Sequence, residues 1–131
     1  MLNYLVFLSG EKDANMGFPS PARDYQQERL DWNKLITDHP LSTFYFRCNS
    51  DAMVDASIVH GAILAVDRSV TPRNGDIVVA SVEGKFTVRY LQRNEYKSKL
   101  IAANKKYADI IMNSDMIVFG VVVSVVMQMT R

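Results

Sequence analysis

A short polar turn occupies the position where the sequence places side chains for chemistry. Residues 49–55 read Asn-Ser-Asp-Ala-Met-Val-Asp and follow a strand-like run at 44–48. Where an antiparallel strand gives way to a turn, side chains are presented to a cleft, and a nucleophile would be useful there. Ala52 stands at the centre of this turn and offers no oxygen to attack a carbonyl carbon. The turn therefore predicts a place for catalysis but lacks the attacking group.

Arg89 is the second position of interest, because a hairpin pattern places it on a strand. Residues 76–82 and 85–91 flank Glu83-Gly84, a two-residue connection in which glycine allows positive φ, as in a β-hairpin. Strand alternation puts Arg89 on the face opposite the aromatic residues. The aromatic face carries Phe86, Val88 and Tyr90, and the other face carries Lys85, Thr87, Arg89 and Leu91.

These two positions resemble the reacting pair of the UmuD and LexA family of self-cleaving serine peptidases. In that family a small polar pair and a serine precede a methionine, and here Ala52 holds the serine position before Met53. Residues 84–91 look like the strand that carries the lysine base of the family, with Arg89 at the lysine position. The resemblance runs from about Met16 to Met129. Residues 17–22 are similar to the segment after the self-cleavage bond of UmuD, and residues 75–80 and 118–122 match further strands.

The resemblance implies a mostly β fold of the LexA/UmuD peptidase type. It consists of antiparallel strands with one short helix and an extended N-terminal arm. Residues 1–22 would form the arm, with a cleavage-like site at Met16-Gly17, and residues 23–131 would form the β domain. Pro19 and Pro21 favour extended backbone before them, the form that a peptidase cleft accepts.

The two substitutions remove the family's chemistry in independent ways. In the family a serine hydroxyl attacks a peptide carbonyl while a neutral lysine removes its proton. Loss of a serine nucleophile costs on the order of a million-fold in rate in a comparable enzyme. Burial can bring a lysine pKa of about 10.4 near neutrality, whereas an arginine that titrates above about 12.5 stays charged. Ala52 and Arg89 at the nucleophile and base positions therefore predict a chain unable to cut itself.

Two histories fit these substitutions. A natural member of the family has lost both groups and persists as a non-cleaving subunit, or an active serine peptidase has had its serine and lysine exchanged to block cleavage. We favour the first, because Arg89, and Met16 where the family more often has cysteine or alanine, look like drift. The resemblance then implies an accessory subunit of an error-prone translesion polymerase in the SOS response, which binds a UmuC-like polymerase and the RecA filament.

Two other functions receive less support. A LexA-like repressor would need a helix-turn-helix before the cleavage bond, and residues 1–16 are too few for one. Without the family, the sequence would be a small all-β interaction domain.

Composition limits the remaining possibilities. A chain of 131 residues is expected to form one domain, and a net charge of +1 with 22% charged residues supports no direct, sequence-specific DNA binding and no attraction to anionic membranes. The single cysteine, Cys48, fits a reducing cytoplasm. No signal peptide, membrane span, phosphate loop or zinc spacing is recognised, so no cofactor or metal is expected. His39 and His60 are the two histidines, and we expect His39 to be a solvated residue at a helix end.

The other elements are expected around these positions. Residues 25–38 predict a partial helix with Asp31 as its N-cap and Leu35-Ile36 on its buried side. Residues 62–67 predict a central strand and residues 96–102 a further strand, followed by a solvated corner at Lys105-Lys106. Residues 116–129 are too rich in valine for an exposed edge strand, which favours a homodimer, with burial in the core as the alternative.

Overall fold

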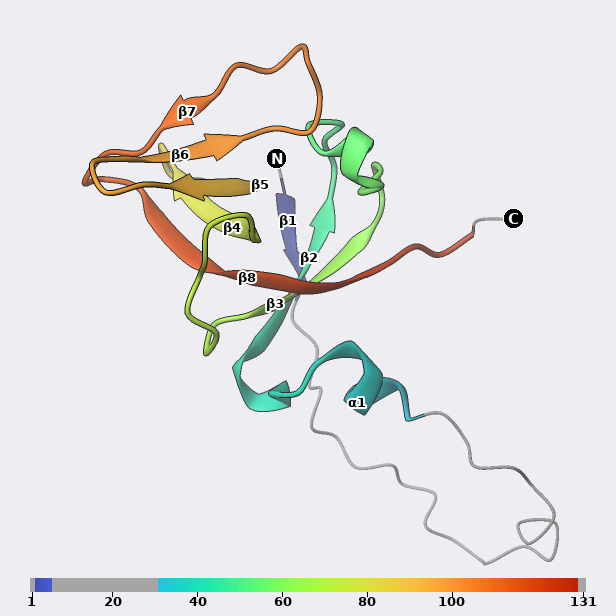
Figure 1. Cartoon of the computed structure of the whole chain (residues 1–131). Coiled ribbons are helices and arrows are strands. Elements are labelled where there is room, and N and C mark those ends of the chain that lie inside the picture. The colour runs from blue at the N-terminus through green and yellow to red at the C-terminus, as the bar shows by residue number, and fades with distance from the viewer. Residues whose placement is uncertain (1, 6–30, 130–131) are drawn as a thin grey trace, which may run out of the picture.

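The computed structural model describes residues 2–5 and 31–129. These residues form one antiparallel sheet with the strand order β1-β2-β3-β8-β4-β5-β6-β7 (Figure 1). Its strands are β1 (Leu2–Leu5), β2 (Thr43–Cys48), β3 (Ile63–Asp67), β4 (Ile77–Val82), β5 (Lys85–Arg93), β6 (Ser98–Ile101), β7 (Ile110–Ile111) and β8 (Ile117–Val126). The helical elements are α1 (Trp32–Ile36) and the 3₁₀ turns η2 (Pro40–Ser42) and η3 (Val54–Ala56). The expected mostly β fold with one short helix is confirmed.

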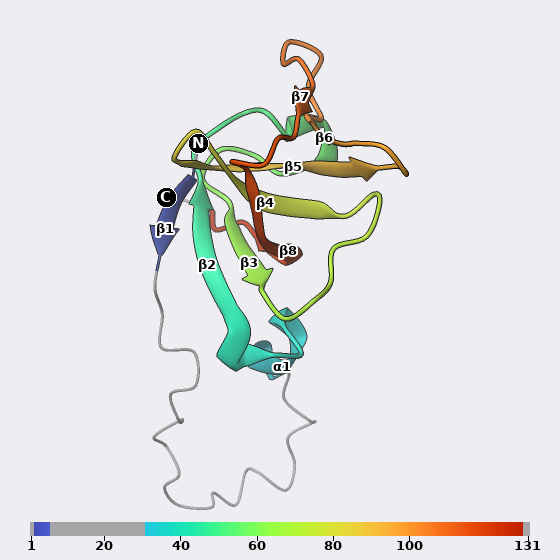
Figure 2. The ribbon, with the colours of Figure 1, turned by 90° about the vertical axis from the view of Figure 1, so that its left-hand side faces the viewer.

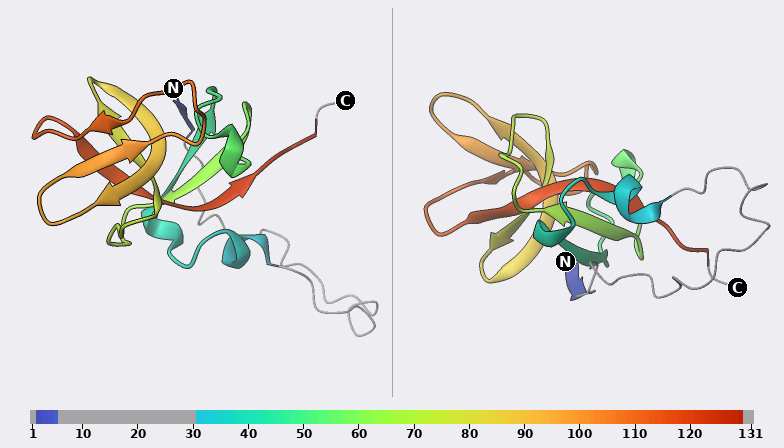
Figure 3. Two further views of the ribbon diagram at one scale, coloured as in Figure 1. Left: turned by 45° about the horizontal axis from the view of Figure 1, so that its top comes forward. Right: turned by 90° about the horizontal axis from the view of Figure 1, so that it is seen from below.

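The sheet is strongly coiled, so its two halves cross. Figure 2 shows β2 and β3 running steeply across β4 and β5, and Figure 3 shows α1 lying at one end of the sheet. Of the expected arm at residues 1–22, Leu2–Leu5 form β1 and pair with β2. The Met16-Gly17 bond and the first part of the predicted 25–38 helix lie outside the described residues. Within residues 2–5 and 31–129, no helix is long and apolar enough to cross a membrane.

Strand β8 lies inside the sheet, which agrees with the alternative of burial in the core and not with a sheet edge covered by a second copy. It pairs with β3 on one side and with β4 on the other. The register with β3 skips Val123, and the register with β4 skips Phe119, so two bulges let one strand serve both halves of the coiled sheet. Burial within one chain explains part of the apolar sequence of β8, since Val121 is only 6% exposed. Val123 and Val125, however, are 41% and 40% exposed.

Gly120 is required where β8 passes β3. A Cβ atom at this position would lie 2.8 Å from Cγ1 of Val66 and 2.9 Å from the carbonyl oxygen of Asp67. The absent side chain therefore allows the two strands to approach closely at the centre of the sheet.

Two apolar clusters fill the coiled sheet. The first is centred on Phe46, whose ring packs edge-to-face against Phe86 and Phe119 with centroids 5.1 and 5.5 Å apart. The second includes Val78, Ala80, Leu91, Leu100 and Val121. In β4, Val79 packs in the first cluster, whereas its neighbours Val78 and Ala80 pack in the second. Both faces of the strand are therefore buried, which fixes the register of the β4–β5 hairpin.

The predicted hairpin and helix cap are both confirmed. Glu83 and Gly84 have φ values of 51° and 80°, as expected for the two central residues of a type I′ turn. The Asp31 side chain accepts hydrogen bonds from the backbone N–H groups of Asn33 and Lys34. Leu35, however, is 54% exposed, so its predicted burial was wrong: α1 ends at Ile36 and is too short to bury both residues.

Candidate functional site

The turn after β2 holds Ala52 in a fixed position. Its backbone N–H donates to Oγ of Ser50 at 3.0 Å, and its carbonyl oxygen accepts from the backbone N–H of Ala103 at 2.8 Å. Ala52 itself is fully buried. Its neighbours Asn49, Ser50 and Asp51 line an adjacent pocket. The turn therefore sits where the sequence placed it, with a methyl group at its centre.

Arg89 reaches the same pocket from β5. Arg89 is 8% exposed, and its Nη1 donates a hydrogen bond to the Val88 carbonyl oxygen at 2.7 Å. Its guanidinium carbon lies 5.4 Å from the centre of the Tyr107 ring. Its Nε is buried and has no hydrogen-bond partner. The structure thus brings Arg89 beside the residues that flank Ala52.

The pocket has a volume of about 550 Å³. Its lining consists of Asn49, Ser50, Asp51, His60, Lys85, Thr87, Arg89 and Tyr107. Lys85, Thr87 and Arg89 come from the same face of β5, as strand alternation predicted. The presence of His60 was not anticipated, because it follows the turn in sequence without any local motif.

The loop after β6 closes one side of the pocket through Asp51. The Asp51 carboxylate accepts a hydrogen bond from the Tyr107 hydroxyl at 2.5 Å and forms an ion pair with Nζ of Lys106 at 2.8 Å. The Asn104 side chain donates to the Asp51 carbonyl oxygen at 2.9 Å. Hydrogen bonds from Lys106 and then from Tyr107 lower the pKa of the Asp51 carboxyl below its usual value.

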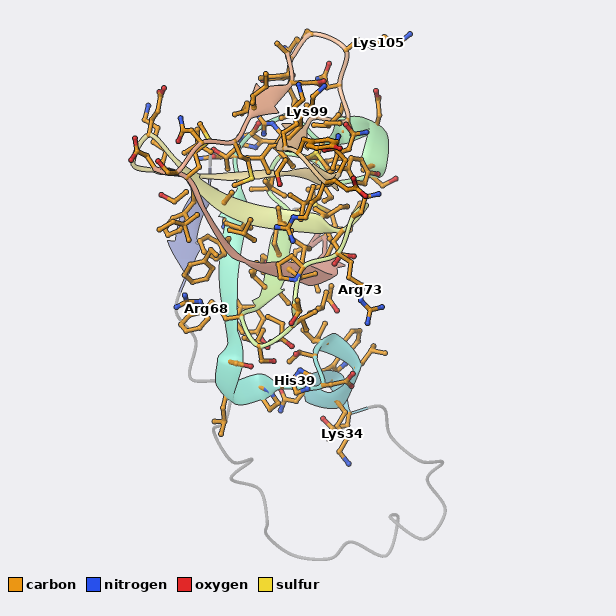
Figure 4. The ribbon with its side chains drawn as sticks, turned by 60° about the vertical axis from the view of Figure 1, so that its left-hand side comes forward. Lys34, His39, Arg68, Arg73, Lys99 and Lys105 are labelled. Atoms are coloured by element: carbon orange, nitrogen blue, oxygen red, sulfur yellow. The ribbon has the colours of Figure 1, made fainter. Side chains whose placement is uncertain are left out.

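Both lysines of the predicted corner are exposed, as expected, although a contact with Asp51 was not anticipated. Lys105 points outward from the tip of this loop (Figure 4), but Lys106 contacts Asp51. The contacts of Asn104 and Tyr107 with Asp51 join residues 53 and 56 positions apart. No local pattern signals a contact over that separation.

The electrostatics of Arg89 exclude its use as a base. Burial lowers the pKa of its guanidinium, while interactions with Tyr107 and Cys48 act in the opposite direction. An arginine begins so far above neutrality that it remains charged and has no lone pair to accept a proton. The pocket therefore has a cation at residue 89 and lies beside a methyl group at residue 52.

His39 lies away from this pocket, beside Asp67. Nδ1 of His39 is 2.6 Å from Oδ2 of Asp67, and the histidine side chain is 53% exposed near α1 (Figure 4). The solvated position of His39 was predicted, but its contact with a buried carboxylate was not. In the described part of the chain, no group of three or more His, Cys, Asp or Glu residues is placed to hold a metal ion.

A coiled antiparallel sheet with such a turn after β2 and a basic residue on β5 is the arrangement of a LexA/UmuD-type peptidase domain. A family model described as "Peptidase S24-like" matches residues 7–123, and the chain belongs to this family. The family membership inferred from the motifs is confirmed.

Relatives are found among several bacteria. The chain is 44% identical to the protein ImpA of Escherichia coli over 75 residues, covering 57% of this chain and 52% of ImpA. It is 38% identical to the protein SamA of Salmonella typhimurium over 106 residues, covering 81% of this chain and 74% of SamA. It is 32% identical to the LexA repressor of Carboxydothermus hydrogenoformans over 109 residues, covering 82% of this chain and 53% of the repressor. The chain thus spans about half the length of ImpA and of the repressor.

Proposed function

We propose that this chain is a UmuD-like accessory subunit of an error-prone translesion polymerase in the SOS response that does not cleave itself. It acts by contact, with a UmuC-like polymerase and the RecA filament as partners, in the cytoplasm. The observation that supports the proposal is a pocket that is lined by Arg89 and lies beside the buried Ala52, the residues that the resemblance assigns to the base and nucleophile positions. The similarity to ImpA and SamA supports the UmuD-like assignment.

The loss of cleavage follows from the chemistry of both side chains. Acyl transfer by this mechanism needs a hydroxyl to attack and a neutral amine to take its proton. The Ala52 methyl group cannot form an acyl intermediate, and the Arg89 guanidinium holds its proton at neutral pH. The fold around them is intact, because hydrogen bonds join the turn 49–52 to the loop after β6, and β6 pairs with β5. We therefore propose that the chain keeps the fold around a peptidase site but lacks the two reacting side chains.

Restoring the two groups separately and together tests this proposal. The unaltered chain should stay at full length with RecA, nucleotide and single-stranded DNA. Ala52→Ser alone should stay intact because it has no base, and Arg89→Lys alone because it has no nucleophile. The double variant should cut slowly at Met16-Gly17, and faster as the pH rises toward about 10, because more of the lysine is neutral. Ala52→Ser combined with Arg89→Met, which supplies a hydroxyl without an amine, is the matched control.

Mass spectrometry over hours separates the outcomes. A fragment beginning at Gly17 from the unaltered chain would contradict the proposal. Cleavage by Ala52→Ser alone would show that Arg89 does not occupy the base position. An intact double variant would show that the site has lost catalytic geometry as well as its two groups.

We also propose that a second copy of the chain covers the exposed part of β8 and the residues after it. Val123, Val125 and Met127 are 41%, 40% and 50% exposed and alternate along one segment. Exposed apolar groups in a row favour association between subunits. Sedimentation at micromolar concentration should give about twice the chain mass, and Val125→Asp should shift it toward the monomer. A monomer before the substitution would contradict the proposal.

A further inference from the structure

We infer that the pocket beside Ala52 binds a carboxylate carried by a peptide segment. The inference rests on the proposed absence of cleavage, because Arg89 then recognises a ligand in place of activating a nucleophile. The ligand accepts a hydrogen bond from Arg89 and donates one to Asn49.

Two buried polar atoms of the pocket lining lack partners. One is Nε of Arg89, a donor on a residue that is 8% exposed, and the other is the side-chain oxygen of Asn49, an acceptor. Leaving a buried polar atom unpaired costs roughly 1–3 kcal/mol, and more where the group is charged. Both atoms belong to residues that line the same pocket, so a ligand with an anionic oxygen and an N–H group matches their two requirements. A peptide that bears a carboxylate has these two groups.

The charges along β5 favour an anion. Lys85, Thr87 and Arg89 present an ammonium, a hydroxyl and a guanidinium to the pocket from alternate positions of one strand. Asp51 is the acidic residue of the lining, and its carboxylate is already engaged by Lys106 and Tyr107. The pocket therefore keeps an excess of positive charge, centred on a guanidinium whose planar donors match a carboxylate.

A single peptide carboxylate fits this pocket better than the backbone of a nucleic acid. The whole chain carries a net charge of only +1, and Lys34, Arg68, Arg73 and Lys105 lie at widely separated places on the molecule (Figure 4). A polyanion gains affinity from many cations along its path, and it would also meet Asp51 at this pocket. One buried guanidinium balances one negative charge.

Three small probes test the two halves of the recognition. N-acetylglycine carries both a carboxylate and an amide N–H, acetate carries only the carboxylate, and N-acetylglycinamide is neutral. Each is titrated into the full-length protein while the Arg89 Nε–H signal is followed by NMR. N-acetylglycine should bind in roughly the millimolar range, as expected for a ligand of so few atoms. It should bind more tightly than acetate and much more tightly than N-acetylglycinamide, and it should shift the Arg89 signal.

Variants on one strand provide the matched control. Arg89→Gln should weaken N-acetylglycine binding roughly tenfold or more, the expected loss for one charge-assisted hydrogen bond. Asn49→Ala should reduce the preference for N-acetylglycine over acetate. Arg93→Gln removes an exposed arginine of β5 outside the pocket and should leave binding unchanged. The NMR spectrum of each variant reports whether it is folded, and the titration of the unaltered chain does not depend on any variant.

Several results would overturn the inference. These are equal binding of N-acetylglycine and N-acetylglycinamide, an unmoved Arg89 signal, or full affinity in folded Arg89→Gln. Tighter binding of inorganic phosphate or of an oligothymidylate would reassign the pocket to phosphate. The proposed function fails by a different measurement, because self-cleavage of the unaltered chain appears in mass spectrometry whether or not a carboxylate binds.

Discussion

Two buried charges in this protein are treated in opposite ways. Asp67, at the end of β3, is 1% exposed and accepts four hydrogen bonds. Its donors are the Ser42 hydroxyl at 3.0 Å, the Ser69 backbone N–H at 2.8 Å, the Ser69 hydroxyl at 2.7 Å and Nδ1 of His39 at 2.6 Å. Arg89 is similarly buried, yet it donates to one carbonyl oxygen and keeps a buried Nε without a partner.

The difference separates a charge that holds the fold together from one held for a ligand. Removing either charge from water carries a large cost, which hydrogen bonds must offset. Asp67 recovers that cost inside the chain, since its donors tie η2 and the turn after β3 to the end of the strand. Arg89 does not, and it is one of the residues that line the pocket.

The largest expected effect is the loss of Asp67. Asp67→Ala should lower the free energy of unfolding by roughly 2–4 kcal/mol, because it leaves several donors facing a cavity. Chemical denaturation at neutral pH measures the change. Asp38→Ala, which removes an exposed carboxylate of the same segment, should change the stability little. Equal effects of the two substitutions would remove the contrast between Asp67 and Arg89.

The acid side of the stability profile should also depend on Asp67. Burial opposes ionisation, but hydrogen bonds from Ser69, His39 and Ser42 outweigh it and lower the pKa of the Asp67 carboxyl. A carboxyl with a lowered pKa in the folded state stabilises the protein above its unfolded pKa of about 4 and loses this contribution as pH falls further. Stability should therefore fall below about pH 4, and less steeply in Asp67→Asn. Parallel acid profiles of the two proteins would contradict this account.

Arg89→Met should change the free energy of unfolding much less than Asp67→Ala does. Replacing an incompletely paired buried charge by an apolar side chain of similar length should leave the free energy of unfolding unchanged or raise it by roughly 1 kcal/mol. Arg93→Met on the exposed part of β5 is the control and should be neutral. If Arg89→Met destabilised the protein by more than about 2 kcal/mol, Arg89 would be a structural residue like Asp67.

The smallest expected change concerns the two lysines of the loop after β6. Lys106→Met should raise the pKa of Asp51 toward its usual value, because it removes the largest cause of the lowering. Lys105→Met removes a neighbouring lysine that points outward and should leave that pKa unchanged (Figure 4). An NMR titration of the Asp51 carboxyl carbon distinguishes the two variants. Equal shifts would show that the pair of Lys106 and Asp51 contributes no specific interaction.

The sequence predicted what depends on local order. The Glu83-Gly84 turn, the Asp31 cap and the shared face of Lys85, Thr87 and Arg89 follow from neighbouring residues alone, and the structure has all of them. At residues 116–129 the valine content predicted burial, but it could not decide between a second copy and the interior of the sheet, because it does not report strand order. Only the bulges at Phe119 and Val123 show how β8 serves two neighbours.

The long-range parts of the site could not be predicted in the same way. Tyr107 and Asn104 reach Asp51 across more than fifty residues, as 56 and 53 positions separate them. The same limit applies to His39 and Asp67, which are 28 residues apart. The unpaired state of the Arg89 Nε and the Asn49 oxygen is a property of the packed pocket, and a sequence has no signal for it.

The pairing of β1 with β2 determines what a cut in the residues between them would expose. Residues Leu2 to Leu5 lie antiparallel to Tyr45 to Cys48 and cover the outer side of β2. A cut at Met16-Gly17 would release this covering strand and leave β2 as a bare edge, a template to which a strand of another protein can add. In a chain that is not cut, β1 stays paired with β2, so β2 is not available to a strand of another protein. Amide hydrogen exchange in β2 should accordingly be slow in the full chain and faster in a chain that begins at Gly17.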